Sequence, residues 1–181
     1  MSMTVIEHIE LTGSESSIVL DEIPADYTDL IIVLSLRSSF TGGSNSNMLL
    51  RLNDSTGTYT TRGLQGNGSS TSSSDNIDVI FSGYTYIGSA LPSATTTANT
   101  FSNVQLYFPN YASSNAKSFS TDSVMENNAT YSVQHILGHL WSGTAAINKV
   151  EIFDSNGNFV QYSSATLYGI TAGSDGTTTV S

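Results

Sequence analysis

The chain has little positive charge and no cysteine. The absence of cysteine from its 181 residues excludes disulfide bonds, thiolate metal sites and cysteine nucleophiles. Five Lys and Arg residues stand against 15 Asp and Glu residues, which gives a net charge of −10. Because phosphate contacts require cations, this balance argues against nucleic-acid binding and against docking on an anionic membrane.

Long apolar runs are missing as well. No stretch approaches the roughly 18 consecutive apolar residues of a membrane-spanning helix, and the N-terminus lacks a basic segment followed by an apolar one. We therefore expect neither a secretory signal nor membrane insertion. No repeat of roughly 20 to 50 residues is visible, which argues against a solenoid or a propeller.

Charged residues make up only 11% of the chain, against about 25% in an ordinary globular protein. Ser, Thr, Gly and Asn take their place, while the apolar content is too high for disorder. The length fits one domain, expected at residues 1–170, followed by a polar tail at 171–181. Such a composition is typical of an all-β protein. It is also typical of a protein whose surface is partly covered by other subunits, because interfaces are depleted in Lys and Glu.

The most apolar segment lies at residues 23–37. Pro24 favours an extended conformation for Ile23, and six aliphatic residues follow almost without a break between Leu30 and Leu36. β-Branched residues and the lack of a helix cap predict a long strand here. Such a strand needs cover on both faces, or one face in the core and the other at a partner surface.

Similar alternation predicts strands along the rest of the chain. They are expected at residues 3–11, 17–20, 48–53, 58–65, 77–81, 101–108, 116–124, 131–141, 147–153 and 159–170. These short strands, with frequent turn signals and no helical period, predict an antiparallel β-sandwich of jelly-roll type with about eight to ten strands.

Some pairings and loops are also predicted. Residues 3–20 are expected to form an N-terminal hairpin, and the Asn156-Gly157 pair is the strongest hairpin signal of the chain. The polar strand at 116–124 is expected at a sheet edge. Exposed polar loops are expected at residues 38–47, 66–75 and 92–99.

His135 and His139 are the first candidates for a metal site. In a helical H-E-x-x-H motif the residue after the first His is the general base, but here it is Ile136. On a strand, side chains four residues apart lie about 13 Å from each other, which is too far to share a metal ion. Two histidines in a half-buried strand beside Trp141 are the simpler interpretation.

Asp154, Asn156 and Asn158 have the spacing of the first ligands of a calcium loop. Phe159 occupies the position that requires glycine, and no glutamate closes the loop. A hairpin turn is therefore favoured. Binding of a loosely held calcium ion stays an alternative interpretation of these residues. No metal or cofactor site is predicted.

Two carboxylate pairs could in principle serve glycoside hydrolysis. They are Asp75 with Asp78 and Asp26 with Asp29, and each pair flanks the start of a strand. Acidic turn residues explain them more simply. No nucleophile elbow, Walker motif or dinucleotide-binding glycine pattern is present, so no catalytic residue is predicted.

Aromatic residues are the more promising contact residues. As candidates for a subunit interface or a glycan contact we single out Tyr59, Tyr84, Tyr86, Tyr107, Tyr111 and Trp141. The alternative is that these side chains form the ordinary core and rim of a sandwich.

Four segments carry a resemblance to a known group. They are IPADYTDL at 23–30, LRLNDS at 50–55, Trp141 shortly before Ala146-Ile147, and TLYGI at 166–170. Together they resemble virion structural proteins of tailed bacteriophages, notably those of aquatic bacteria. The segments are structural, so the resemblance implies a β-sandwich module in a virion and carries over no functional residue.

Within that group we expect a non-enzymatic capsid decoration (cement) protein on the outer surface of the shell. It would bridge neighbouring capsid subunits. The expected partners are the major capsid protein and copies of the chain itself, which would form a homotrimer. The alternative is a tail-fibre or receptor-binding module that recognises host surface glycans through Tyr and Trp side chains and the three polar loops. A polysaccharide-degrading enzyme is a third and weaker interpretation.

Overall fold

The structure, a computed structural model, describes residues 2–74, 83–128 and 131–172. These residues form twelve strands and no helix, so none crosses a membrane as a long apolar helix. The strands are β1 (Ser2–Glu10), β2 (Ser17–Leu20), β3 (Asp29–Ser35), β4 (Asn45–Leu52), β5 (Tyr59–Gly66), β6 (Thr71–Ser74), β7 (Thr85–Pro92), β8 (Asn103–Pro109), β9 (Lys117–Met125), β10 (Val133–Trp141), β11 (Val150–Asp154) and β12 (Ser164–Thr171).

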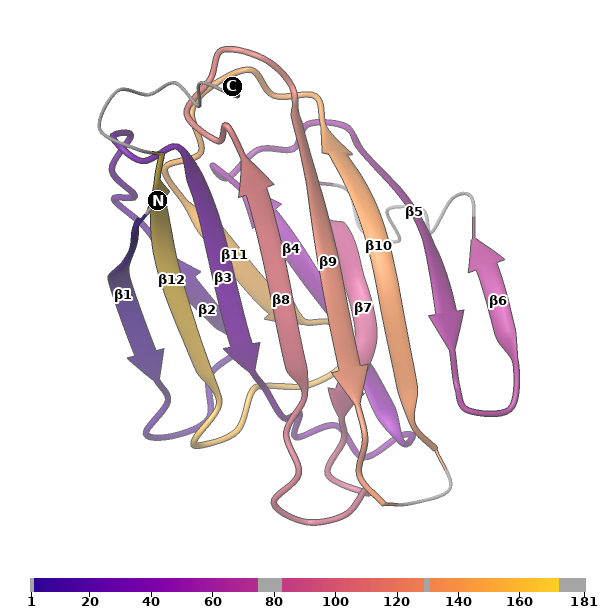
Figure 1. Ribbon diagram of the computed structural model, residues 1–181. Coiled ribbons are helices and arrows are strands. Elements are labelled where there is room, and N and C mark those ends of the chain that lie inside the picture. Colours follow the sequence, from indigo (N-terminus) through magenta and orange to yellow (C-terminus); the bar gives the residue numbers. More distant parts are fainter. Residues whose placement is uncertain (1, 75–82, 129–130, 173–181) are drawn as a thin grey trace.

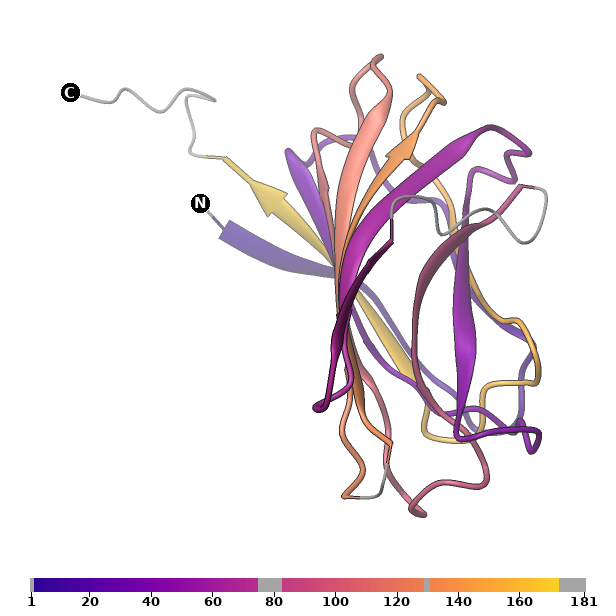
Figure 2. The same cartoon turned by 90° about the vertical axis from the view of Figure 1, so that its right-hand side faces the viewer.

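Two antiparallel sheets of unequal width form the molecule (Figure 1). The larger sheet has eight strands in the order β1-β12-β3-β8-β9-β10-β5-β6, and the smaller has four in the order β2-β11-β4-β7. Figure 2 shows the four-stranded sheet on one side of the eight-stranded sheet. The predicted all-β antiparallel sandwich is therefore confirmed, with more strands than expected.

The apolar segment at 23–37 contains a central strand, as predicted. β3 pairs with β12 on one side and with β8 on the other. Leu30, Ile32 and Leu34 point into the core, whereas Ile31 and Val33 point to the opposite face. Val33 is 38% exposed, so this strand has one face in the core and the other uncovered in the single chain.

The core lies between the two sheets. The alternation of buried and exposed residues along each strand determines which side chains enter it. Strand β10 alternates strictly between buried and exposed residues along its whole length, and β9 does so along most of its length. The larger buried side chains that meet there include Ile18, Leu50, Leu52, Leu106, Phe108, Ile152 and Leu167. Burial of this apolar area is the main stabilising contribution to the fold.

Both predicted hairpins are wrong, because the strands involved pair with strands that are distant in the sequence and not with each other. β1 pairs with β12, and β2 pairs with β11 in the other sheet. The chain around Asn156 and Gly157 leaves β11 and crosses to β12 in the eight-stranded sheet. A two-residue hairpin of this type needs positive φ at both turn positions. Neither of these two residues has positive φ.

Two further expectations are corrected. β9, predicted at an edge, lies between β8 and β10, because its alternate residues Phe119, Thr121 and Ser123 are buried in the core. Within the loop expected at 66–75, residues Thr71–Ser74 form β6 and pair with β5.

Some predictions fall partly or wholly outside the described residues. They are the strand at 77–81, the pair of Asp75 and Asp78, and most of the tail at 171–181. β12 ends at Thr171, one residue beyond the expected domain end.

Candidate interaction surface

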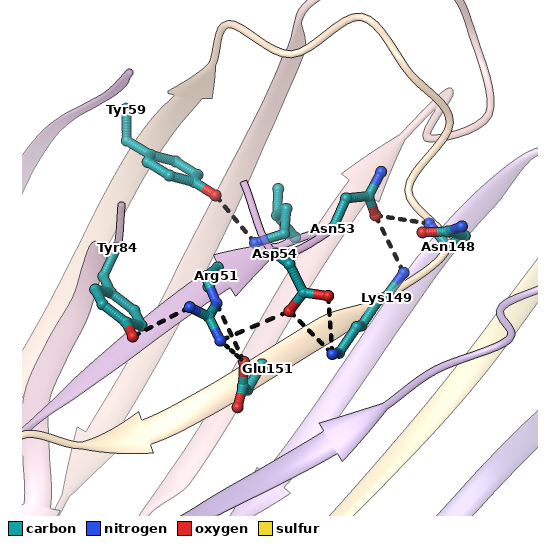
Figure 3. Close-up of polar contacts among 9 residues, drawn as sticks. Arg51, Asn53, Asp54, Tyr59, Tyr84, Asn148, Lys149 and Glu151 are labelled. Carbon is teal, nitrogen blue, oxygen red and sulfur yellow. Dashed lines mark hydrogen bonds and ion pairs between the residues drawn. The ribbon is translucent and has the colours of Figure 1, made fainter. Parts of the chain in front are cut away.

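Four of the six aromatic candidates belong to the interior, which corrects the prediction that they form a contact surface. Tyr59, Tyr86, Tyr111 and Trp141 are at most 7% exposed. Trp141 stacks on Tyr59 with ring centroids 6.5 Å apart. The Tyr59 hydroxyl accepts a hydrogen bond of 3.0 Å from the Leu52 N–H group (Figure 3). These rings fill the sandwich and are closed to a partner or a sugar.

Tyr84 and Tyr107 are half-buried, and their role as contact residues stays a prediction. The Tyr107 hydroxyl donates to Asp29 Oδ2 at 2.8 Å, and this hydrogen bond raises the pKa of Tyr107. Tyr84 packs edge-on against Phe153 with ring centroids 4.9 Å apart. It also lies under the Arg51 guanidinium, 5.1 Å from the ring centre.

Arg51 and Glu151 centre a polar cluster on the outer face of the smaller sheet (Figure 3). They are register partners on β4 and β11, and Arg51 Nε donates to Glu151 Oε2 at 3.1 Å. This bond raises the pKa of Arg51. Asp54 lies 3.6 Å from Arg51 and accepts from Lys149 Nζ at 2.9 Å.

The same cluster is fixed by Asn53, whose φ is 51°. Its side-chain oxygen accepts from the Asn148 and Lys149 N–H groups at 2.9 and 3.1 Å. The amide thus ties the turn after β4 to the segment before β11. Each charge in the cluster faces an opposite charge. The arrangement therefore holds β4 and β11 together and offers no reactive group.

Two further cations are buried and bind backbone carbonyl groups. Arg37 donates to the carbonyl oxygens of Thr97 and Thr100 at 2.8 and 2.9 Å, and Lys117 donates to that of Ser113 at 2.7 Å. Burial lowers the pKa of Arg37 and of Lys117. These cations hold loops in place, which leaves the exterior more acidic than the composition alone implies.

His135 and His139 point into the space between the sheets and are 0% and 3% exposed. His139 Nε2 lies 3.0 Å from Thr121 Oγ1 and its Nδ1 lies 3.0 Å from Thr61 Oγ1. Burial lowers the pKa of His135 to about 4 and that of His139 to about 3, so both rings are neutral at pH 7. Within the described part of the chain no three His, Cys, Asp or Glu residues gather to hold a metal ion.

Ser89 and His135 have the separation of a nucleophile and its base, with Oγ and Nε2 3.0 Å apart. Both are buried, at 7% and 0% exposure. His135 Nδ1 has no hydrogen-bond partner, so no third group orients the ring as a catalytic triad requires. The pair therefore belongs to the packing of β7 against β10.

Asp154, the first residue of the considered calcium loop, binds groups of the chain itself. Its carboxylate accepts hydrogen bonds from the hydroxyls of Ser38 and Ser46 and from the Asn156 N–H group at 3.1 Å. The side chain of Asn158 donates instead to Ser14 at 3.3 Å. Asp154 and Asn156 thus share one hydrogen-bonded turn with Ser46, whereas Asn158 bonds elsewhere, and the geometry favours a structural turn.

Two of the three loops considered for glycan binding meet at one end of the sandwich. Thr95 Oγ1 donates to the Gly43 carbonyl at 2.8 Å, and the Ala94 N–H group donates to the Phe40 carbonyl at 2.9 Å. The loop between β5 and β6 is closed by Asn67, whose side-chain oxygen accepts from the Ser69 and Ser70 N–H groups.

The largest uncovered feature is the outer face of the eight-stranded sheet. The smaller sheet packs on its inner face, and Figure 2 shows no described strand across the central outer face. Of the seven large apolar side chains exposed in the described residues, three lie on neighbouring strands β5 and β10, namely Leu64 (58%), Ile136 (57%) and Leu140 (42%).

This face alternates between ridges and hollows. One hollow of about 290 Å³ is lined by residues that include Leu64, Gly66 and Ile136. A second, of about 240 Å³, lies beside Gly138 and Tyr107. The aromatic candidates do not indicate this surface. The alternation of residues 131–141 could have indicated it, since Ile136, Gly138 and Leu140 have the parity opposite to that of the buried residues.

Comparison of the chain with protein-family models, with curated proteins and with solved structures finds no match.

Proposed function

We propose that the chain is a non-enzymatic structural protein of a tailed-phage particle, and that it works as a capsid decoration (cement) protein. The observation that carries this proposal is the broad, uncovered outer face of the eight-stranded sheet, with Leu64, Ile136 and Leu140 exposed on it. Exposed apolar groups on a rigid surface favour contact with other proteins. The resemblance of the sequence segments to virion proteins gives the setting.

The chemistry of the polar side chains supports the same proposal. The five cations Arg37, Arg51, Arg62, Lys117 and Lys149 all donate hydrogen bonds to atoms of the chain itself. The two buried histidines contact hydroxyl groups in the core. These groups stabilise a rigid module, as expected for a protein that adds contact area between neighbours.

In this proposal the protein binds the outer surface of the shell and spans neighbouring copies of the major capsid protein. Each added contact raises the free energy needed to separate the subunits, which resists the pressure of packaged DNA. An acidic exterior, with a net charge of −10, also discourages adsorption of nucleic acid.

The test is addition of the purified chain to shells that lack it. Saturable co-sedimentation with intact shells, together with a higher temperature of shell disruption, is the expected result. A chain that stays in the supernatant at all ratios, or that binds without stabilising the shells, contradicts the proposal. Heat-unfolded chain is the control for non-specific adsorption.

A receptor-binding module at a tail fibre is the second candidate. It is favoured by the contact between the loops that contain Gly43 and Thr95, which gathers polar groups at one end of the sandwich. A glycan array separates the two candidates. Reproducible binding to one class of sugar, lost on substitution of Thr95, supports the fibre module, whereas binding to shells alone supports decoration.

A further inference from the structure

Gly138 occupies a position where the single chain does not require glycine. It lies on β10, exposed on the outer face, and β10 pairs without a register shift with both β5 and β9. An added Cβ would meet nothing closer than the Arg62 carbonyl oxygen at 4.0 Å, and its φ is not positive. Since glycine weakens a strand interior, it often marks a site where another backbone or ligand approaches closely.

Gly63 on β5 provides a contrast within the same pair of strands. There an added Cβ would clash with the Leu137 side chain and lie 2.6 Å from the Ile136 carbonyl oxygen. Packing inside the chain therefore explains Gly63. Nothing in the described residues explains Gly138, so the reason for it lies outside the described fold.

The surroundings of Gly138 form a notch between two ridges. Ile136 and Leu140 precede and follow it on the same face of β10, and both are exposed. Their Cα atoms lie about 13 Å apart along the strand, with glycine midway. An aliphatic side chain from a partner fits such a notch, and Ile136 beside it is an exposed aliphatic side chain of this kind.

The charge on this face suits a second copy of the chain. On the outer face of the eight strands, the acids are Glu10, Asp29 and Asp122 and the base is Arg62. Three acids and one base leave two net negative charges there, whereas the whole chain carries −10. Two acidic copies can therefore approach through this face with little like-charge repulsion.

The size of the face is also sufficient. Eight strands spaced about 4.8 Å apart and about seven residues long give an outer face of roughly 900 Å². A stable interface of standard size buries about 800 Å² on each partner. Packing of two sheets face to face is a common way to cover them.

We propose that the outer face around Gly138 is the contact between two copies of the chain, arranged about a two-fold axis. In a two-fold contact, residue i of one copy meets residue j of the other, and j meets i. An axis that passes between residues 136 and 138 places Ile136 of each copy over Gly138 of the other. This inference deepens the proposed function and rests on it only in that this face contacts a protein. It names a second copy as the occupant, so the dimer would bind the shell through its other surfaces.

The first test is analytical ultracentrifugation of the full chain over a range of concentrations. The wild-type chain is expected to sediment as a dimer. Gly138→Val fills the notch with a side chain that suits a strand, so it should raise the dissociation constant at least tenfold. At a concentration at which both chains are monomers, it should leave the unfolding midpoint unchanged or higher. Ser17→Val, at the edge of the other sheet, is the matched control and should leave the dimer intact.

The second test uses the absence of native cysteine. Because sheets packed face to face lie about 10 Å apart, beyond the Cα separation that a disulfide bridges, a short bis-maleimide is the cross-linker. A mixture of Ile136→Cys and Gly138→Cys chains is expected to give a cross-linked mixed dimer, and a mixture of Ser17→Cys with Gly138→Cys is expected to give none. A wild-type monomer at the highest soluble concentration, a trimer mass, or a dimer unaffected by Gly138→Val overturns the inference. A monomer that still binds shells rejects this inference and leaves the proposed function standing.

Discussion

Trp141 stacks on Tyr59 at the end of β10, with an interplanar angle of 20°, and both rings are buried. Trp141 is the one tryptophan of the chain, so its fluorescence reports on the core alone. We expect blue-shifted emission that iodide quenches weakly and that shifts to the red on unfolding. Addition of sugars should leave the emission unchanged. Strong quenching of the folded chain by iodide would show that the ring is exposed.

Tyr59→Phe tests the hydroxyl of the same pair. The Leu52 N–H group would lose its partner at 3.0 Å, and an unsatisfied buried donor costs about 1–3 kcal/mol. We expect the free energy of unfolding, measured by urea denaturation, to fall by that amount. Tyr162→Phe changes an exposed tyrosine and is the matched control, expected to have no effect. Equal effects of the two variants would contradict the assigned role.

The two buried histidines predict sensitivity to acid. Their pKa values in the folded chain are about 4 for His135 and about 3 for His139, against about 6.5 when unfolded. Between these values the unfolded chain binds more protons, so the free energy of unfolding rises with pH. The stabilisation is complete above about pH 6.5 and is lost as the pH falls toward 4, with a slope of up to about 1.4 kcal/mol per pH unit for each ring.

Urea denaturation at several pH values between 7 and 4 measures this slope. His139→Asn keeps a polar group beside Thr121 but removes the titration, so it should flatten the pH dependence even if it lowers the stability at pH 7. An unchanged slope in the variant would mean that carboxylates, and not His139, cause the loss in acid.

Asp154→Asn should destabilise the chain. The buried carboxylate accepts from two hydroxyls and from the Asn156 N–H group, and hydrogen bonds to a charged group contribute about 1.5–3 kcal/mol each. We expect a loss of roughly 2–3 kcal/mol in the free energy of unfolding. The effect should be the same in EDTA as in calcium. If calcium stabilised the wild type but not the variant, Asp154 would be a calcium ligand, which would contradict the structural turn.

Arg51 and Glu151 are expected to couple weakly. A double-mutant cycle with Arg51→Met and Glu151→Gln should give about 0.5–1 kcal/mol, because the pair keeps contact with solvent, with side chains 25% and 12% exposed, and is partly screened by water and salt. The coupling should shrink at high salt. A coupling of several kcal/mol would indicate that this surface is desolvated, as it would be under a partner on the smaller sheet.

Local patterns predicted the strands far better than their partners. The alternation of residues 101–108 and 131–141 reappears directly in β8 and β10, since a period of two follows from the pleat. The pairing of β1 with β12 joins residues 154 to 169 positions apart, from Glu10 with Ser164 to Ser2 with Thr171. Nothing local encodes that contact. The Asn156-Gly157 signal failed because the side chain of Asp154 fixes the turn through tertiary hydrogen bonds.

The candidate contact residues show the same limit. Tyr59 and Trp141 were selected for their chemistry, but burial is decided by strand parity, which places them in the core. Parity alone would have pointed to Ile136 and Leu140. The role of Gly138 needs the structure, because only the space around an added Cβ distinguishes it from Gly63.

The most direct measurement is the location and number of copies on the purified virion, by cryo-electron microscopy and quantitative mass spectrometry. A decoration protein predicts density on the outside of the shell, a copy number that is a fixed multiple of the capsid symmetry, and a covered outer face of the eight-stranded sheet. A few copies confined to the tail tip, or none on the particle, would contradict the proposal.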